Sequence, residues 1–271
     1  MRSKTVIAFI LLQIASFAHA FSDFVPLRER AQAHSLTGAI QSNESIFSNP
    51  AASAFNQEYT LEGTFAFPRS FSASVLDTRT SQVGGGLAYF KEQDSESEGY
   101  RHGVRVSLSS RVSETVAVAV AGKAIWSKNQ MESSNFKDLD AGLIWNAGFA
   151  TAGFVLRNFS GGDKQAEQER EMSLGGRIGY SQTMYLSAAA HSKWGQFAPY
   201  EYGVGVEYVS PWYFSLMGGY RFQTDNSSLE PSCWSLGVSF LSPKLSLHYA
   251  LELPESLEPD SSHLLGLSMA F

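Results

Sequence analysis

The stretch HLLGLSMAF (residues 263–271) ends the chain and alternates strictly between two kinds of position. Leu265, Leu267, Met269 and Phe271 are large and apolar, and most of the residues between them are small. Successive side chains of a β-strand point to opposite faces of the sheet. The stretch is therefore predicted to be a strand with one apolar face, and the same pattern can be sought in the rest of the chain.

The start of the chain has the features of a secretory signal peptide. Arg2 and Lys4 give it a positive start, residues 5–17 form an apolar core, and residues 18–20 form an A-x-A cleavage site. The apolar core is shorter than the stretch of about 20 residues that a membrane-spanning helix needs. The chain is therefore expected to be exported and to lose residues 1–20.

Charge and composition exclude several classes of protein. The 20 basic and 26 acidic residues give a net charge of −6, or −8 without Arg2 and Lys4, and this acidic balance argues against a nucleic-acid partner. After the signal, no apolar run reaches the length of about 18 residues that indicates a membrane-spanning helix. The single cysteine, Cys233, excludes a disulfide framework and lies too far from the cleavage site to carry a lipid anchor.

From Tyr59 onward the chain consists of runs of about 8 to 11 residues with period two, separated by turn-forming residues. Each run is predicted to be a β-strand, which gives fourteen strands. They lie at residues 57–67, 70–76, 81–91, 101–109, 114–126, 137–146, 148–158, 171–181, 183–191, 199–209, 212–221, 233–241, 244–252 and 262–271.

The connections between these runs alternate in length. Even-numbered runs are followed by tight turns such as DTRT (residues 77–80), and odd-numbered runs by longer polar stretches such as residues 91–100, 161–170 and 223–232. Only the first connection, around Pro68, breaks the alternation. Bacterial membrane barrels have short periplasmic turns and longer outer loops, so both termini are expected on the periplasmic side.

The direction of the alternation favours a membrane-spanning antiparallel β-barrel over a soluble β-sandwich or a periplasmic barrel. The large apolar side chains repeat on one face of nearly every run, while the other face carries Gly, Ala, Ser and scattered charges. A sandwich would place its bulky side chains in its core. Aromatic residues also lie near the ends of the runs, as interfacial girdles require. They are Tyr89, Trp126, Trp145, Tyr180, Tyr200, Trp212, Tyr220 and Trp234.

The last run resembles the closing strand of bacterial outer-membrane barrels. This resemblance implies a Gram-negative type of outer membrane as the location and outer-membrane lipid as the surroundings. It also implies an assembly signal at Leu267, Met269 and Phe271 that the barrel-assembly machinery recognises.

The motif SNPAASA (residues 48–54), preceded by TGAI (residues 37–40), resembles the segment that opens the FadL-like barrels. This superfamily includes long-chain fatty acid transporters and the PorV/PorQ proteins of secretion systems. The resemblance is carried by Asn49, Pro50 and Ala51, and implies fourteen strands with an N-terminal plug in the lumen. The chain is accordingly divided into a signal peptide (1–20), a plug segment (21–56) and a transmembrane β-barrel (57–271).

A physical argument also supports the plug. A barrel of about fourteen strands has a wide lumen, and its inward positions are too small to fill it. They include Gly84, Gly86, Ala117, Ala119, Gly175, Gly203, Gly205 and Gly237. The polar segment before the first strand has a suitable size, and Pro50 would fix one backbone angle where it turns into the wall. The alternative is that Asn49 and Pro50 form only a turn before a strand.

Ten charged or titratable residues fall on the lumen side of the runs, where charge avoids lipid. They are Arg105, Lys123, Asp138, Asp140, Arg177, Glu201, Glu207, Arg221, His248 and Glu252. The first four lie on three successive strands, so pairing between strands is expected. A structural role that joins wall and plug is favoured over ligand binding.

Three functions remain open. The first is a conduit for hydrophobic small molecules, as the FadL-like resemblance implies. The second is a PorV/PorQ-like scaffold that binds secretion components through its outer loops, and the third is a diffusion porin. The chain has no G-x-S-x-G or H-E-x-x-H motif and no metal-ligand spacing, so an enzyme, a cofactor and a metal are not expected. A monomer is expected.

Overall fold

The computed structural model describes residues 24–67, 70–93, 99–128, 133–160, 170–181, 183–196, 198–224, 232–255 and 261–271. The predicted signal peptide, residues 1–20, lies outside the described residues. Fourteen strands form one closed barrel. They are β1 Tyr59–Phe67, β2 Ser70–Asp77, β3 Val83–Gln93, β4 Tyr100–Arg111, β5 Val116–Lys128, β6 Ser133–Asn146, β7 Ala150–Arg157, β8 Glu171–Tyr180, β9 Met184–Lys193, β10 Glu201–Val209, β11 Phe214–Gln223, β12 Cys233–Leu241, β13 Leu245–Pro254 and β14 Ser262–Ala270.

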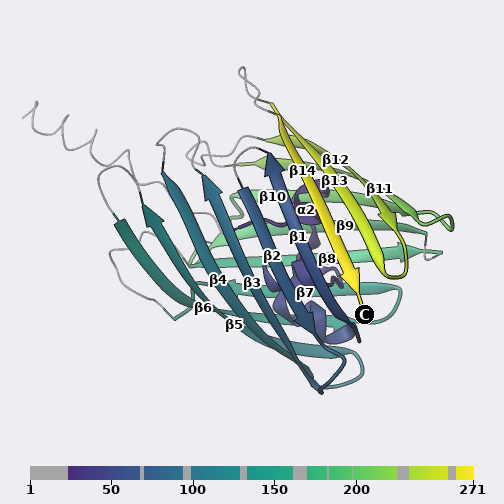
Figure 1. Cartoon of the computed structure of the whole chain (residues 1–271), viewed down its shortest axis with the longest axis horizontal. Coiled ribbons are helices and arrows are strands. Elements are labelled where there is room, and N and C mark those ends of the chain that lie inside the picture. The colour runs from purple at the N-terminus through teal and green to yellow at the C-terminus, as the bar shows by residue number, and fades with distance from the viewer. Residues whose placement is uncertain are drawn as a thin grey trace, which may run out of the picture.

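Each strand pairs antiparallel with its neighbours in the sequence, and the last strand closes the barrel on the first (Figure 1). The closing register runs from Thr60 opposite Ala270 to Phe67 opposite His263. A closed sheet leaves no unpaired edge. The prediction of an all-β, up-and-down barrel of fourteen strands is confirmed.

One predicted connection is shorter than expected. The connection after β5 was predicted to span residues 127–136, but β5 continues to Lys128 and β6 begins at Ser133. The two strands stay paired up to Lys128 opposite Ser133, because the alternation of side chains continues through Trp126 and Phe136. The connection between β7 and β8, residues 158–170, is long as predicted.

The two faces of the wall differ in chemistry as the sequence pattern predicts. Outward side chains such as Leu174, Leu236 and Phe240 are more than half exposed, whereas the inward face carries Gly, Ser, Ala and charged residues. A closed antiparallel barrel with an apolar outer face satisfies its backbone internally and can lie in lipid. The architecture is that of an outer-membrane barrel.

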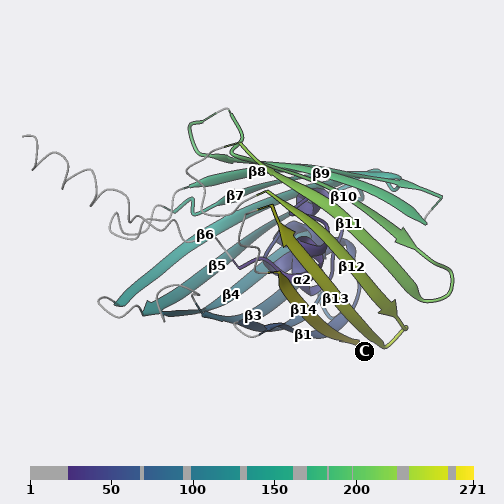
Figure 2. The same cartoon turned by 90° about the horizontal axis from the view of Figure 1, so that it is seen from above.

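The N-terminal segment, defined here as residues 24–56, lies inside the barrel (Figures 1 and 2). It consists of α2 Leu27–Ala31 and three 3₁₀-helices, η2 Leu36–Gly38, η3 Asn43–Ile46 and η4 Pro50–Phe55. None of the helices in the described part of the chain is long and apolar enough to cross a membrane. α2 contacts β11 to β14, η2 contacts β7 to β9, η3 contacts β1 to β4, and η4 contacts β3 to β6. Every side of the segment therefore faces the wall, while the predicted limits of a plug domain, residues 21–56, stay a prediction.

Candidate functional site

Inward glycines allow the N-terminal segment to approach the wall closely. A Cβ atom built at Gly203 would lie 2.1 Å from the carbonyl oxygen of Ala33, and one at Gly153 would lie 2.2 Å from that of Thr37. Any side chain at these positions would displace the backbone of the segment. The small inward residues therefore make room for residues 24–56.

One ion-pair cluster centres on Glu207 of β10, whose side chain is only 1% exposed. Arg28 of the segment donates to Glu207 Oε1 at 2.8 Å, and Arg177 of β8 donates to Glu207 Oε2 at 2.8 Å. Gln32 Nε2 is a third donor at 3.3 Å. Two guanidinium groups, one from the segment and one from the wall, share a single buried carboxylate, so the wall and the segment form one charge cluster.

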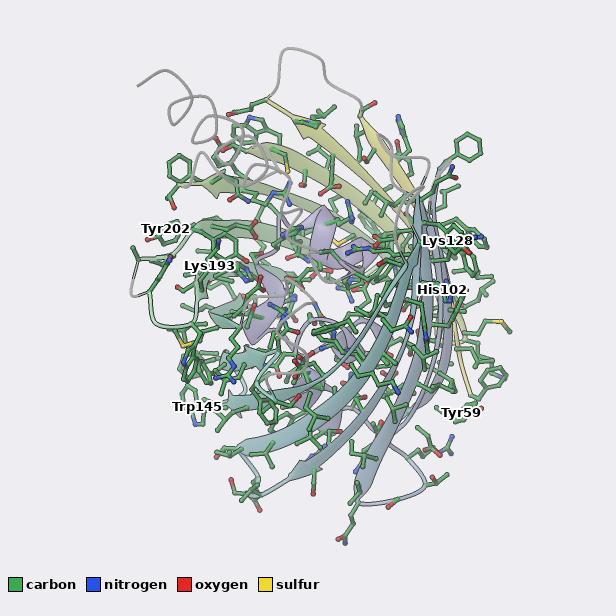
Figure 3. All side chains as sticks on the ribbon, turned by 90° about the vertical axis from the view of Figure 1, so that its left-hand side faces the viewer. Tyr59, His102, Lys128, Trp145, Lys193 and Tyr202 are labelled. Atoms are coloured by element: carbon green, nitrogen blue, oxygen red, sulfur yellow. The ribbon has the colours of Figure 1, made fainter. Side chains whose placement is uncertain are left out.

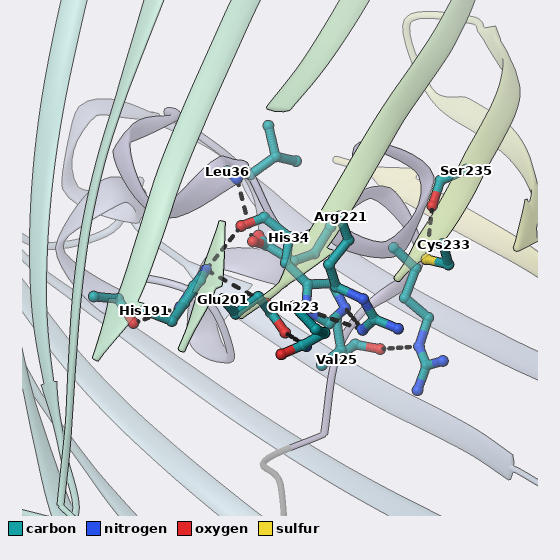
Figure 4. A network of polar contacts seen from close by, with 12 residues as sticks. Val25, His34, Leu36, His191, Glu201, Arg221, Gln223, Cys233 and Ser235 are labelled. Atoms are coloured by element: carbon teal, nitrogen blue, oxygen red, sulfur yellow. Dashed lines mark hydrogen bonds and ion pairs between the residues drawn. The ribbon is translucent and has the colours of Figure 1, made fainter. Parts of the chain in front are cut away.

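A second cluster joins His34 of the segment to β10 and β11 (Figure 4). His34 Nδ1 lies 2.9 Å from Glu201 Oε1, and His34 Nε2 lies 3.1 Å from Arg221 Nη1. Since a guanidinium can only donate, Nε2 of His34 accepts and Nδ1 donates to Glu201. Gln223 Nε2 donates to the second oxygen of Glu201, so both carboxylate oxygens are used.

The segment's own backbone completes this second cluster. His191 of β9 donates from Nε2 to the carbonyl oxygen of His34 at 3.0 Å, while its Nδ1 accepts from Ser173 Oγ at 2.8 Å. Arg30 forms a further ion pair, with Nη1 2.7 Å from Oε2 of Glu252 on β13. The first half of the segment is therefore held to the wall by charged and strongly polar contacts.

The motif residue Asn49 makes contacts of a different kind. Its Nδ2 donates to the carbonyl oxygens of Thr37 at 2.9 Å and of Leu143 on β6 at 3.2 Å, and its Oδ1 accepts from the Ala51 amide at 3.1 Å. Pro50 is the first residue of η4, where its missing N–H costs no hydrogen bond. Asn49 thus starts η4 and attaches it to the wall without any charge.

Other contacts of η3 and η4 are also uncharged or use backbone oxygens. Asn43 Nδ2 donates to Ser74 Oγ of β2 at 2.9 Å, and Ser53 Oγ lies 2.9 Å from Ser109 Oγ of β4. Arg111 Nε donates to the carbonyl oxygen of Ala54 at 2.7 Å. No ion pair joins residues 43–55 to the wall among the residues that the structure describes.

An apolar cluster lies next to this region, inside the lumen. Phe24 stacks near two other rings, with centroids 4.9 Å from Phe47 and 5.3 Å from Phe90 of β3. The cluster is completed by Ile46, Leu76, Ala88, Ile125 and Phe136. A pocket beside Phe24 is lined by Val25, Arg30, Thr64, Ala66, Ser70, Phe71 and Leu264 and has room for about one water molecule. An apolar surface of this kind inside a polar lumen is suited to apolar molecules.

Two carboxyl groups of the segment are buried. Glu44, 4% exposed, accepts from the backbone N–H of Arg28 at 2.7 Å. Burial, reinforced by the negative charge of Glu62 on β1, raises the pKa of Glu44 well above its ordinary value. Burial also raises the pKa of Glu29, which accepts from the Leu36 amide at 3.2 Å. Both groups resist ionisation as long as the segment stays docked.

The structure places all the lumen-side candidates on the inward face but divides them into separate groups. Glu201, Glu207, Arg177, Arg221 and Glu252 belong to the clusters around the segment. Arg105 and Lys123 pair instead with Asp140, which also accepts a hydrogen bond from the backbone N–H of Asn158 at 2.9 Å. Asp138 accepts a hydrogen bond from the backbone N–H of Ser160 at 2.9 Å. His248 Nδ1 lies 2.7 Å from Ser239 Oγ within the wall. No group of three His, Cys, Asp or Glu side chains in the described ranges could hold a metal ion.

The predicted assembly-signal residues Leu267, Met269 and Phe271 lie on the lipid-facing side. Leu267 pairs with Gly63 and Met269 with Leu61 across the closure of the barrel. The ring of Phe271 lies 5.9 Å from that of Tyr59. All three side chains of the predicted assembly signal, including Phe271 at 58% exposed, remain accessible.

The sequence pattern does not identify the segment's own partners. Arg28, Arg30 and His34 lie in a region without periodicity, so no pattern indicates which wall residue each one meets. The signal that could have found them is charge balance, because the lumen-side candidates include the carboxylates Glu201, Glu207 and Glu252. Phe24 is not identified either, because no pattern distinguishes a lumen aromatic residue in such a segment.

Comparisons with known proteins show the fold. The chain matches no protein-family profile and no curated protein by sequence. Among solved structures, the Pseudomonas putida toluene transporter TodX matches with a TM-score of 0.69 at 9% identity, covering 92% of this chain and 99% of that one. The CymD monoaromatic hydrocarbon channel matches with a TM-score of 0.67 at 11% identity over 91% and 97% of the two chains. A Pseudomonas aeruginosa FadL homologue matches with a TM-score of 0.64 at 12% identity over 93% and 99%. The chain therefore shares the barrel fold of these solved structures, as predicted.

Proposed function

We propose that this barrel conducts small hydrophobic molecules across the outer membrane, with residues 24–56 as a plug that must shift for passage. The observation that carries the proposal is the aromatic cluster of Phe24, Phe47 and Phe90 inside the lumen. A hydrocarbon gains free energy by leaving water for such a surface, about 25 cal/mol for each Å² of apolar area that is buried. Similarity to barrels named as hydrocarbon channels supports the same substrate class.

The charged contacts suit a plug that can be displaced. The pocket beside Phe24 holds no more than about one water molecule, so a ligand must move Phe24 or its neighbours to enter. Arg28, Arg30 and His34 form discrete, directional contacts with the wall. Such contacts break and reform more readily than interdigitated apolar packing.

The proposal is tested by uptake of radiolabelled toluene in cells of an outer-membrane-intact strain with and without the chain. Phe47→Asn should slow uptake several-fold because it places a polar group in the cluster, and Phe47→Leu is the matched control that keeps an apolar side chain. Both substitutions lie in the plug and leave the wall unchanged. Uptake that is identical with and without the protein would overturn the proposal and leave the secretion scaffold as the better alternative.

The remaining expectations belong to the same proposal. A diffusion porin is disfavoured because the segment fills the lumen against every side of the wall. Export by the signal peptide, residence in a Gram-negative type of outer membrane and absence of catalysis fit a conduit. The exposed side chains of Leu267, Met269 and Phe271 are available to the assembly machinery.

A further inference from the structure

The charged residues of the outer face are distributed unevenly around the barrel. On the lipid-facing side of the described strands, all the lysines lie on β3, β5 and β6, as Lys91, Lys128 and Lys137, and all three are exposed. The described outward positions of β7 to β14 carry no Lys, Arg, Asp or Glu. A lysine against lipid costs free energy unless it reaches the interface, so this grouping on one side needs a compensating partner.

The lysines lie at the end of the barrel that carries the long connections. Lys91 is close to the end of β3, Lys128 is the last residue of β5, and Lys137 lies within the first half of β6. The one outward carboxylate on the described strands, Asp77, is at the opposite end, beside the short turn between β2 and β3. No carboxylate among the described residues pairs with any of the three lysines, so their positive charge is not balanced by the wall.

Aromatic rings connect the lysines across neighbouring strands. A row runs from Phe71 through Tyr89 and His102 to Trp126, with successive centroid distances of 5.6, 6.3 and 5.5 Å. Tyr100 stacks on His102, and its ring lies 5.4 Å from Lys91 Nζ. Aromatic residues of this kind lie at the level of lipid headgroups. The row therefore marks the depth at which the lysines meet the membrane surface.

The register places two lysines on either side of one ring. Tyr100 is directly opposite Lys128, and Lys91 is directly opposite His102, which follows Tyr100 on the same face of β4. Figure 3 labels His102 and Lys128 on the barrel wall. Adjacent strands are about 4.8 Å apart, so Lys91 and Lys128 can contact one headgroup together. Lys137 on β6 is opposite Ala124, the outward position next to Trp126 on β5, and extends the positive surface.

We propose that this surface, defined by Lys91, Lys128 and Lys137 with the ring row of Phe71, Tyr89, His102 and Trp126, binds a lipid whose headgroup carries phosphate. The lysines bind the phosphate groups, and the rings and the apolar wall below them contact the acyl chains. Each lysine near an anionic lipid surface adds binding free energy, whereas the opposite side of the barrel offers the same apolar belt without the charges. The proposal does not depend on what the lumen conducts.

The test is native mass spectrometry of the full-length protein in detergent with added lipid A, either bisphosphorylated or enzymatically dephosphorylated. The variant Lys91→Gln/Lys128→Gln/Lys137→Gln should bind the bisphosphorylated lipid at least about tenfold more weakly than the wild type. Lys244→Gln, in the short turn between β12 and β13, is the control and should bind as the wild type does. The dephosphorylated lipid should bind all forms equally weakly.

Two results would overturn the proposal. Equal affinity of the wild type for the two lipids would show that the lysines only reach the interface without recognising phosphate. Equal affinity of the triple variant and the wild type for the bisphosphorylated lipid would show that the three lysines do not bind its phosphate groups. Heat-modifiable migration on gels shows whether each variant is a folded barrel, and Lys128→Gln alone, with a smaller expected loss, serves if the triple variant does not assemble.

Discussion

The two halves of the N-terminal segment are held to the same wall by different kinds of contact. The charged half, residues 27–38, contacts β7 to β14 and uses the ion pairs of Arg28 and Arg30 and the hydrogen bond between His34 and Glu201. The neutral half, residues 43–55, contacts β1 to β6 through amides, hydroxyls and apolar side chains. Docking of the charged half therefore depends on salt and on each counter-charge, while docking of the neutral half depends on uncharged hydrogen bonds and apolar packing.

This difference suggests which half moves. Breaking a buried ion pair by removing one partner is costly, but the free segment can return its charges to water, where they are well solvated. The neutral half is joined to the Phe24, Phe47 and Phe90 cluster, whose exposure to water is unfavourable. We expect the charged half to undock first, with the neutral half as the fixed end.

The largest effect is expected for Glu207→Gln. The substitution leaves Arg28 and Arg177 without their shared carboxylate, at a cost of about 3 kcal/mol in docking free energy. This cost is at the lower end of the range for buried pairs because Arg28 keeps 24% of its side chain exposed. Hydrogen exchange should accelerate in residues 27–38 and change little in residues 43–55. Glu114→Gln, in the exposed turn between β4 and β5, is the control. Uniform exchange in both halves would contradict two separately held halves.

The converse substitution is Asn49→Ala in the neutral half. It removes the donor to Thr37 and Leu143 and the acceptor for Ala51, and the buried groups left unpaired cost about 1–3 kcal/mol. Exchange should now rise in residues 43–55. Gln57→Ala, exposed just before β1, should have no effect. Protection that persists around η4 would show that Asn49 does not hold this half.

Glycine substitutions in the wall compare how closely the wall approaches the charged half, at Gly203, and the neutral half, at Gly86. An added Cβ at Gly203 meets the backbone oxygen of Ala33 at 2.1 Å, whereas one at Gly86 meets side-chain atoms, Ser107 Oγ at 2.5 Å and Ile46 Cγ1 at 2.8 Å. Because a backbone yields less than a rotatable side chain, Gly203→Ala should weaken docking more than Gly86→Ala, by about 1–2 kcal/mol. Gly85→Ala, with no atom within 4 Å of its Cβ, is the control. Hydrogen exchange in residues 27–38 for Gly203→Ala and in residues 43–55 for Gly86→Ala measures docking, and equal exchange in all three variants would contradict close backbone contact.

The smallest expected effect is a pH dependence. Because burial raises the pKa of Glu44 above its ordinary value of 4.5, the docked segment holds a proton that the undocked segment releases. Docking is therefore fully stabilised below about pH 4.5 and loses this contribution as the pH rises through the raised pKa. Trypsin cleavage should increase from pH 5 to pH 8, less so in Glu44→Gln. The same increase in both forms would assign the effect to another group.

The sequence predicts the strands of the barrel wall far better than the contacts of the N-terminal segment inside it, for a physical reason. Each wall residue has one of two environments, lipid or lumen, so a period of two places Glu207, Asp140 and Leu265 on the correct face without knowledge of the fold. The N-terminal segment has no such period. Its contacts, such as Arg28 with Glu207, join residues 179 positions apart in the sequence, and only the closed barrel brings them together. The motif at Asn49 does not indicate the carbonyl groups of Thr37 and Leu143 to which this side chain donates.

The central claim is that residues 24–56 close the lumen of this barrel. Single-channel recording of the full-length protein in planar lipid bilayers tests it most directly, with Glu207→Gln recorded in parallel. The account predicts a wild-type barrel with no steady ion conductance, and a variant that shows opening events as its charged half undocks. A wild-type barrel that conducts ions steadily from the moment of insertion would contradict the account.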